Sequence, residues 1–324
     1  MTDSAMLERI LVDADPARTP RDATPDARAL IDRDRIVRRA RPRRTSAPLI
    51  GWAGGLTAVA ASAAIAVAVL LPQNAAVAGT PSPLSFEDAG SVDEIVADAR
   101  ATLAAAGSDA PQRSVRSASW SFAVDLGSER TEIVPELVSL DWATDRSGVT
   151  VAVEGEPYDP EDAEANVGAE VSSSGDVAWR VEMAPGEFSA PVVELNGSGR
   201  DEVLDILHAY WLPTEYTATD VVIALTSVLG QWTPSNAQEA EMIGILAEMD
   251  GVEALGATTD RLGRPATGVR VVTPDGTASD VVLISDETGR IAGIERTWLG
   301  EDGVFPTGGI ISYQLWDVDE GVLR

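Results

Sequence analysis

The stretch ATGVRVVTPDGTASDVVLISDETGRIAGIERTWL, residues 266–299, decides the fold of this chain. It holds three apolar runs separated by two short polar turns, and these segments are 266–273, 278–285 and 290–299, with PDG at 274–276 and DETG at 286–289 between them. Apolar runs joined by short turns that contain Asp and Gly are typical of β-hairpins. The stretch therefore predicts three consecutive antiparallel strands.

Further strands flank this stretch on both sides. Apolar side chains alternate with polar or small ones in SWSFAVDL (119–126), where Trp120, Phe122, Val124 and Leu126 would share a buried face. Such a period of two is typical of a strand with one buried face. The other expected strands are centred on Val138–Trp142, on Val149–Val153, on Val177–Met183 and on residues 252–259 and 309–317. We expect about nine antiparallel strands.

Helical periodicity appears in two places. Ser91-Val92-Asp93-Glu94 has the spacing of a capping box, and apolar residues recur after it every three or four positions. In the middle of the chain we expect helices at Asp201–Tyr210, Asp220–Leu229 and Ser235–Met249. Strands in two blocks, with helices before and between them, predict an α+β domain in which a curved antiparallel sheet packs on helices.

Charge is divided unevenly along the chain. The 24 basic residues are all Arg, and 11 of them lie in residues 1–46 beside 8 acidic residues. Residues 47–71 carry no charge, and the remainder has 13 Arg against 44 acidic residues. A surface this acidic repels nucleic acid, so we expect no nucleic-acid partner.

The uncharged stretch has the length of a membrane span. Residues 50–71, IGWAGGLTAVAASAAIAVAVLL, would span about 33 Å as a helix, against a hydrocarbon core of about 30 Å. Basic residues precede it and none follows it until Arg100, which by the positive-inside rule places the N-terminus in the cytoplasm. The arginines nearest to the predicted membrane are Arg38, Arg39, Arg41, Arg43 and Arg44.

These features give a domain plan. We expect a cytoplasmic Arg-rich tail (1–46), one transmembrane helix (47–72), a linker (73–90) and an acidic extracytoplasmic domain (91–324). The alternative is a cleaved signal peptide, since Ala76-Val77-Ala78 resembles a small-residue cleavage site. The long preceding tail and the 22-residue apolar run favour an uncleaved anchor.

The composition excludes several classes of enzyme. Cysteine and lysine are absent, so thiolate catalysis, Cys-ligated metals and Schiff-base chemistry are impossible. His208 is the single histidine, and we interpret it as a packed or capping residue on a helix. No glycine-rich loop leads from a strand into a helix. We therefore expect no catalytic, cofactor-binding or metal-binding residues, and no enzyme.

Aromatic residues and the tail offer two candidate binding regions. Trp120, Phe122, Trp142 and Trp179 lie on predicted strands and could line an apolar face for an acyl chain or a hydrophobic peptide. In the tail, Met6, Leu7, Ile10 and Leu11 would share one helical face, which could dock a cytoplasmic partner. The alternative for the tail is a chain whose arginines hold anionic lipid of the bilayer.

The segments VRSASWSF (115–122), PELVSLDWATDRSG (135–148), ILAEMDGVEALGATTDRLGRP (245–265) and LISDETGRIAGIE (283–295) carry a family resemblance. With the Arg-rich tail and Ala-rich span, the chain resembles single-pass membrane proteins of high-GC Gram-positive bacteria that are often encoded beside an extracytoplasmic-function sigma factor. The outer domain also resembles the lipoprotein-carrier fold, a half-barrel clasping helices.

Two functions remain open at this point. The resemblance implies a regulatory membrane protein, in which the outer domain senses a state of the cell envelope and the tail acts on a sigma factor. The alternative is a carrier-like module that binds lipid or lipoprotein and is tethered to the membrane. No cofactor is expected in either case.

Overall fold

The computed structural model of the chain describes residues 80–122, 133–158, 171–301, 305 and 307–319. The Arg-rich tail with Arg38–Arg44, the predicted span 47–72 and Ala76–Ala78 lie outside the described residues. Within the described part, no helix combines the length and the apolar character needed to cross a membrane.

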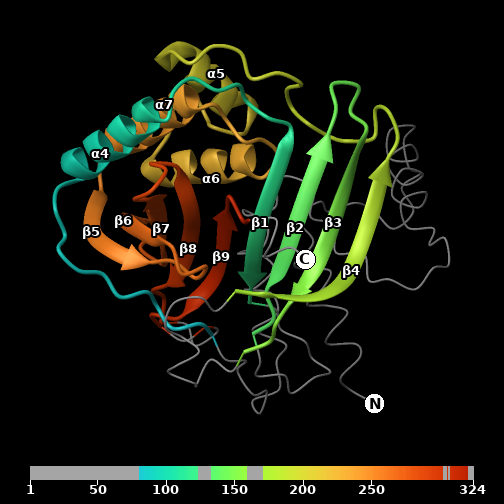
Figure 1. Cartoon of the computed structure of the whole chain (residues 1–324). Coiled ribbons are helices and arrows are strands. Elements are labelled where there is room, and N and C mark those ends of the chain that lie inside the picture. The colour runs from blue at the N-terminus through green and yellow to red at the C-terminus, as the bar shows by residue number, and fades with distance from the viewer. Residues whose placement is uncertain (1–79, 123–132, 159–170, 302–304, 306, 320–324) are drawn as a thin grey trace, which may run out of the picture. The chain divides into compact units, whose positions relative to one another are not determined.

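The described residues form an α+β domain in which a nine-stranded antiparallel sheet packs with four helices (Figure 1). The strands stand in the order β4-β3-β2-β1-β9-β8-β7-β6-β5, so every neighbouring pair is consecutive in the chain except β1 and β9. Their bounds are β1 Ser114–Ser121, β2 Glu136–Trp142, β3 Gly148–Gly155, β4 Ser173–Met183, β5 Val252–Thr259, β6 Pro265–Val272, β7 Ala278–Ser285, β8 Ile291–Trp298 and β9 Ile310–Trp316.

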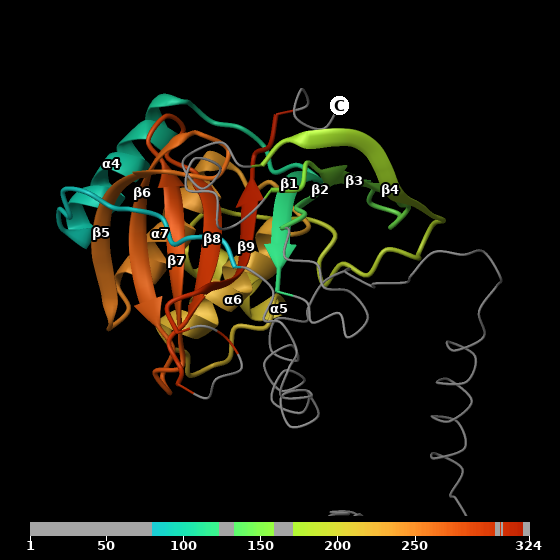
Figure 2. The ribbon, with the colours of Figure 1, turned by 90° about the horizontal axis from the view of Figure 1, so that it is seen from below.

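The helices are α4 (Val92–Ala105), α5 (Arg200–Ala209), α6 (Ala218–Leu229) and α7 (Asn236–Ala247). They gather on one side of strands β5–β9, whereas β2–β4 extend beyond them (Figures 1 and 2). The predicted capping box at the start of α4 is confirmed, because Ser91 and Glu94 cap each other reciprocally. Helix α6 begins two residues before the predicted Asp220, because its N-cap is Thr217, which forms a capping box with Asp220.

The C-terminal hairpins are confirmed. Strands β6, β7 and β8 pair in succession, and β7 has the predicted bounds 278–285. In the first turn the Asp275 carboxylate accepts hydrogen bonds from the Thr273 hydroxyl and the Thr277 backbone N–H. Gly276 and Gly289 have φ values of 70° and 72°, which non-glycine residues rarely adopt.

The first and fourth strands differ from the prediction. β1 is the serine-rich run Ser114–Ser121, which pairs with β2 on one side and with β9 on the other. Val124 and Leu126 lie outside the described residues. In β4, Trp179 lies opposite Ala152 while Val177 lies opposite the next residue, Val153. This irregularity places Val177 and Trp179 on different faces of the sheet, so they do not share the single face predicted.

The sheet has apolar side chains on both faces. In β7 every residue is buried: Val282 and Ile284 pack in the main core beneath the helices, while Val281 and Leu283 pack on the opposite face against Leu84. A strand covered on both faces needs a continuous apolar run, which explains the sequence VVLI at 281–284.

Candidate functional site

Two of the four aromatic residues proposed as a ligand face lie on the helix side of the sheet. Trp142 is buried, its Nε1 donates to the Gln231 carbonyl at 2.8 Å, and its ring packs edge-on against Trp232 at 4.8 Å. Trp179 is half-buried, and its Nε1 donates to the Glu136 carboxylate at 2.9 Å. Trp142 is therefore part of the packed core, whereas Trp179 reaches across β3 to Glu136 of β2.

The other two aromatic residues lie elsewhere. Trp120 follows Ala118 on the face turned away from the helices and stacks on Tyr313, with ring centroids 6.1 Å apart. Phe122 follows β1 and meets the Phe305 ring edge-on at 4.9 Å. The structure thus divides the four side chains between two faces of the sheet and brings no more than two of them to one face.

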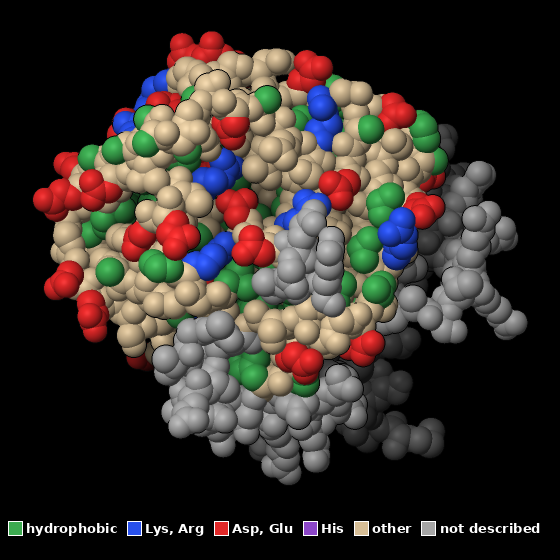
Figure 3. Space-filling view, viewed as in Figure 1, with side chains coloured by type: hydrophobic (Ala, Val, Ile, Leu, Met, Phe, Trp, Pro, Cys, Tyr) green, Lys and Arg blue, Asp and Glu red, His purple; other side chains and the backbone are tan. Residues whose placement is uncertain are grey.

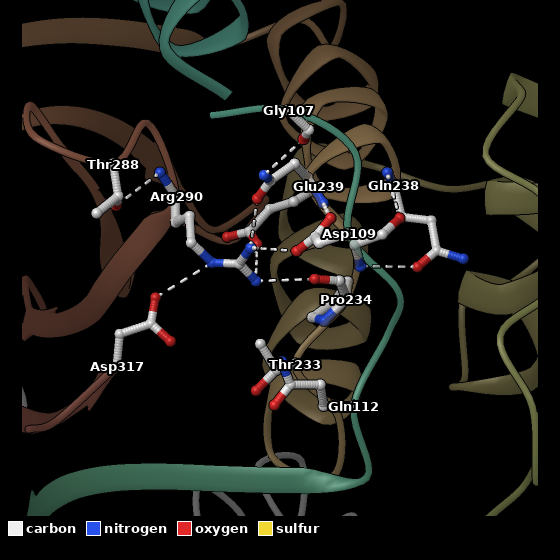
Figure 4. A network of polar contacts seen from close by, with 12 residues as sticks. Gly107, Asp109, Gln112, Thr233, Pro234, Gln238, Glu239, Thr288, Arg290 and Asp317 are labelled. Carbon is white, nitrogen blue, oxygen red and sulfur yellow. Dashed lines mark hydrogen bonds and ion pairs between the residues drawn. The ribbon is translucent and has the colours of Figure 1, made fainter. Parts of the chain in front are cut away.

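A polar cluster that the sequence did not predict centres on Arg290 (Figure 4). Arg290 ends the β7–β8 turn, and its guanidinium donates to Asn236 Oδ1 at 2.8 Å and to the Pro234 carbonyl at 2.9 Å. It also forms ion pairs with Asp317 at 3.2 Å and Asp109 at 3.8 Å. Arg290 therefore joins the sheet to the N-terminus of α7, to the chain after α4 and to the end of β9.

Glu239 is the buried partner of this arginine. It lies in the first turn of α7 with a side-chain exposure of 1%, and its Oε1 accepts the Ile291 backbone N–H at 2.6 Å. Its Oε2 is 2.6 Å from Arg290 Nη2, which also donates to the Pro234 carbonyl, but this close contact lacks the geometry of a hydrogen bond. The ion pair is close, but its geometry leaves one carboxylate oxygen without a donor.

The surroundings of Glu239 perturb its ionisation. Burial raises the pKa of the Glu239 carboxyl to about 7, the positive charge of Arg290 opposes this rise, and the carboxylates of Asp317 and Asp109 add to it. Burial dominates because a charged carboxylate loses its hydration there. The group therefore changes charge near neutral pH, which an exposed glutamate does not.

A small cavity adjoins the cluster. Its lining includes Arg116, Thr233, Glu239, Arg290 and Trp316, and the space open to a water molecule is about 10 Å³. That is room for about one water. Two buried atoms of the lining residues lack a hydrogen-bond partner, Glu239 Oε2 and Trp316 Nε1. The cavity suits one hydrogen-bonding small group and is too small for an acyl chain.

A second buried ion pair lies on the opposite face of the sheet. Arg261 Nε and Nη2 donate to the Glu295 carboxylate at 2.7 and 3.0 Å, with side-chain exposures of 0% and 2%. The guanidinium lies over the Tyr313 ring at 5.1 Å, and Nη2 also donates to the Ser82 carbonyl at 2.8 Å. Burial raises the pKa of Glu295, and the charge of Arg261 opposes this rise.

Residues 82–87, which we call the strap, are part of the predicted linker 73–90 and lie against the sheet. Glu87 exchanges both backbone hydrogen bonds with Ala257 of β5, at 2.9 and 2.7 Å. Thr258 Oγ1 donates to the Ser85 carbonyl at 2.7 Å. Together with the Arg261 contact to Ser82, these bonds fix the strap to the domain at three points.

The lone histidine has a local structural contact. The Nδ1 atom of His208 donates to the Leu212 carbonyl at 2.7 Å, just beyond the end of α5. This bond supports the interpretation of His208 as a capping residue. Groups of three or more side chains suited to hold a metal ion are not found among the described residues.

The outer surface of the domain is acidic. Figure 3 shows Asp and Glu side chains spread over the face in view, with arginines among them.

Comparison of the chain with protein-family models, with curated proteins and with solved structures finds no match. The resemblances noted from the sequence therefore stay predictions.

Proposed function

We propose that this protein is a single-pass membrane regulator, with residues 1–46 in the cytoplasm, a transmembrane helix at 47–72 and the α+β domain outside the membrane. In this proposal the domain responds to a state of the cell envelope, and the tail binds or releases a sigma factor. The charge distribution supports the orientation, because 11 arginines precede the uncharged stretch and the chain beyond it has 13 Arg against 44 acidic residues.

The contacts of the strap with the sheet support the regulatory role in this proposal. Ser82 lies 10 residues beyond Pro72, where the predicted helix ends, and it is already bonded to the buried Arg261–Glu295 pair. In this proposal few residues separate the predicted helix from the first contact of the strap, so a movement of the strap would be transmitted to the membrane segment. A change in the sheet at Glu295 or at the β5 edge would therefore alter how the chain enters the membrane.

The carrier alternative needs space for a hydrophobic ligand. In the part of the chain that the structure describes, the cavity beside Glu239 has polar lining residues and room for about one water. The side of the sheet that meets the helices is filled by apolar side chains such as Leu207, Leu225 and Met242, all with 0% exposure. These observations favour the regulatory function.

Orientation is tested first, with single cysteines in the cysteine-free chain. Ser4→Cys marks the tail, and Glu287→Cys marks an exposed turn of the domain. A membrane-impermeant maleimide should label position 287 in intact cells and position 4 only after lysis. Equal labelling of both positions in intact cells, or labelling of position 4 alone, would refute the proposed topology.

Partner binding is tested separately with the full-length chain extracted in mild detergent. Affinity capture followed by mass spectrometry should recover a sigma factor, and the Leu7→Asp/Ile10→Asp variant should lose it because the apolar face of the predicted tail helix is interrupted. The Asp3→Asn variant serves as a control in the same segment. Absence of a sigma factor from the wild-type capture would reject the regulatory function while leaving the topology result intact.

A further inference from the structure

Strand β4 is one of the two edges of the nine-stranded sheet (Figures 1 and 2). The other edge, β5, is partly covered, since Glu87 of the strap bridges to Ala257 and α4 contacts the strand. On its outer side β4 pairs with no strand among the described residues. A strand edge carries backbone N–H and C=O groups that can pair with another chain.

The exposed side chains of β4 suit such pairing. Val177 is 60% exposed and Val181 is 45% exposed, and Trp179 between them is half-buried. The register irregularities of the β3–β4 pair fall in the first half of β4, so residues 179–183 are its regular part. Bulges, proline and charged side chains usually protect an edge strand. Residues 179–183 contain no bulge and no proline, and their two charged side chains, Arg180 and Glu182, have opposite signs.

We propose that β4 pairs antiparallel with β4 of a second copy of this chain, about a two-fold axis at Val181. This axis is the midpoint of the regular part, residues 179–183. It places Arg180 opposite Glu182 of the other copy, twice by symmetry, and Trp179 opposite Met183. Opposite charges directly across an antiparallel pair stabilise it. The edge is therefore complementary to itself, as a symmetric dimer requires.

Neighbouring registers lack this complementarity. A two-fold axis at Arg180 would place two arginines opposite each other, and an axis at Trp179 would place Asp176 opposite Glu182. Like charges in these positions are destabilising. An axis at Ala178 pairs Val177 with Trp179, but these two side chains point to different faces of the sheet.

The proposed dimer does not depend on the membrane anchor or on a sigma factor.

Arg180 and Glu182 already contact each other within one chain. Arg180 Nη2 lies 3.1 Å from the Glu182 carboxylate, with side-chain exposures of 53% and 73%. Both side chains stand on the same face, two residues apart along the strand. In the dimer each would exchange this exposed contact for one across the new strand pair, so the charges stay balanced while apolar surface at Val181 becomes buried.

The first experiment is disulfide cross-linking of the full-length chain, which has no native cysteine. Residues opposite each other in antiparallel strands have Cα atoms about 4.5–5.5 Å apart, within the range that a disulfide spans. Val181→Cys should form a covalent dimer under mild oxidation. Val272→Cys, at a site of similar exposure (41%), is the matched control and should stay monomeric.

The second experiment uses charge reversal with sedimentation of the full-length chain in detergent. Arg180→Glu and Glu182→Arg should each abolish the dimer, since each puts like charges across the axis. A mixture of the two single variants should restore it, because every Glu then faces an Arg. Cross-linking at Val181 no faster than at Val272, or a dimer that both single variants leave intact, would overturn the proposal.

Discussion

The buried Glu239 makes the stability of the domain depend on pH in an unusual direction. The pKa of this carboxyl is raised from 4.5 to about 7 by burial. At about 1.4 kcal/mol per pH unit, the difference is worth about 3 kcal/mol. Glu239→Gln removes the ionisable group but keeps the shape and polarity of the protonated side chain, so it isolates this contribution.

The sign follows from proton linkage. Because the folded-state pKa lies above the unfolded value, the folded state binds the proton more tightly between these two values. The stabilisation is therefore complete below about pH 4.5 and is lost as the pH rises through about 7. The wild type should lose about 3 kcal/mol relative to Glu239→Gln between these limits.

Urea unfolding of the full-length protein, followed by tryptophan fluorescence between pH 4 and pH 8, measures this difference. The reference is Glu241→Gln, the same chemical change on a side chain of α7 with 22% exposure. Because Glu241 is only partly buried, this variant reports what the change from Glu to Gln does outside the buried cluster. If the difference between the wild type and Glu239→Gln does not vary with pH, or grows in favour of the wild type as the pH rises, the reasoning about Glu239 is refuted.

Three further changes test the packing. Gly289→Ala should lower the free energy of unfolding by about 1–3 kcal/mol more than Gly276→Ala, as measured by urea unfolding. A Cβ at position 289 would lie 2.4 Å from the Ala99 carbonyl oxygen, whereas a Cβ at position 276 meets nothing within 4 Å. Equal losses in the two variants would contradict this argument. Arg261→Met should lower the free energy of unfolding by about 3–5 kcal/mol in thermal melts, because it leaves the buried Glu295 carboxylate without its partner. Adding Glu295→Leu should recover most of this loss. A double variant as unstable as the single one would contradict the burial argument. Trp211→Gly should raise the free energy of unfolding by about 1 kcal/mol, as measured by calorimetry. Trp211 is 68% exposed and has a φ of 78°, a backbone conformation that glycine adopts at lower cost. A loss of stability would show that the Trp211 ring makes a stabilising contact.

The parts of the fold that depend on local sequence were predictable. The turns at 274–276 and 286–289 set the C-terminal hairpins, because turn residues and alternating side chains act over a few positions. The serine-rich β1 begins earlier in the chain than predicted, since its four serines and Ala118 give little alternation of apolar and polar side chains to detect. The irregularity in β4 also escaped prediction, because it appears only in the pairing with β3.

The candidate site depends on residues far apart in the chain. Glu239 bonds to the backbone of Ile291, 52 positions away, and neither neighbourhood is distinctive by itself. One signal was present in the sequence: Glu239 precedes Met242 and Ile243 by three and four positions, on the buried side of α7. A carboxylate on the apolar face of a helix needs a buried partner, but the sequence does not name it.

The pairing of β1 with β9 has a consequence for how the domain is made. Ser117 lies opposite Trp316, so nearly 200 residues of the chain lie between these two paired strands. Strands β1–β4 are synthesised first but cannot join β5–β8 until the last strand has left the ribosome, and pairing over such long distances is slow. A chain that stops before Ile310 would leave both β1 and β8 with an open edge, and two open edges on one molecule favour aggregation.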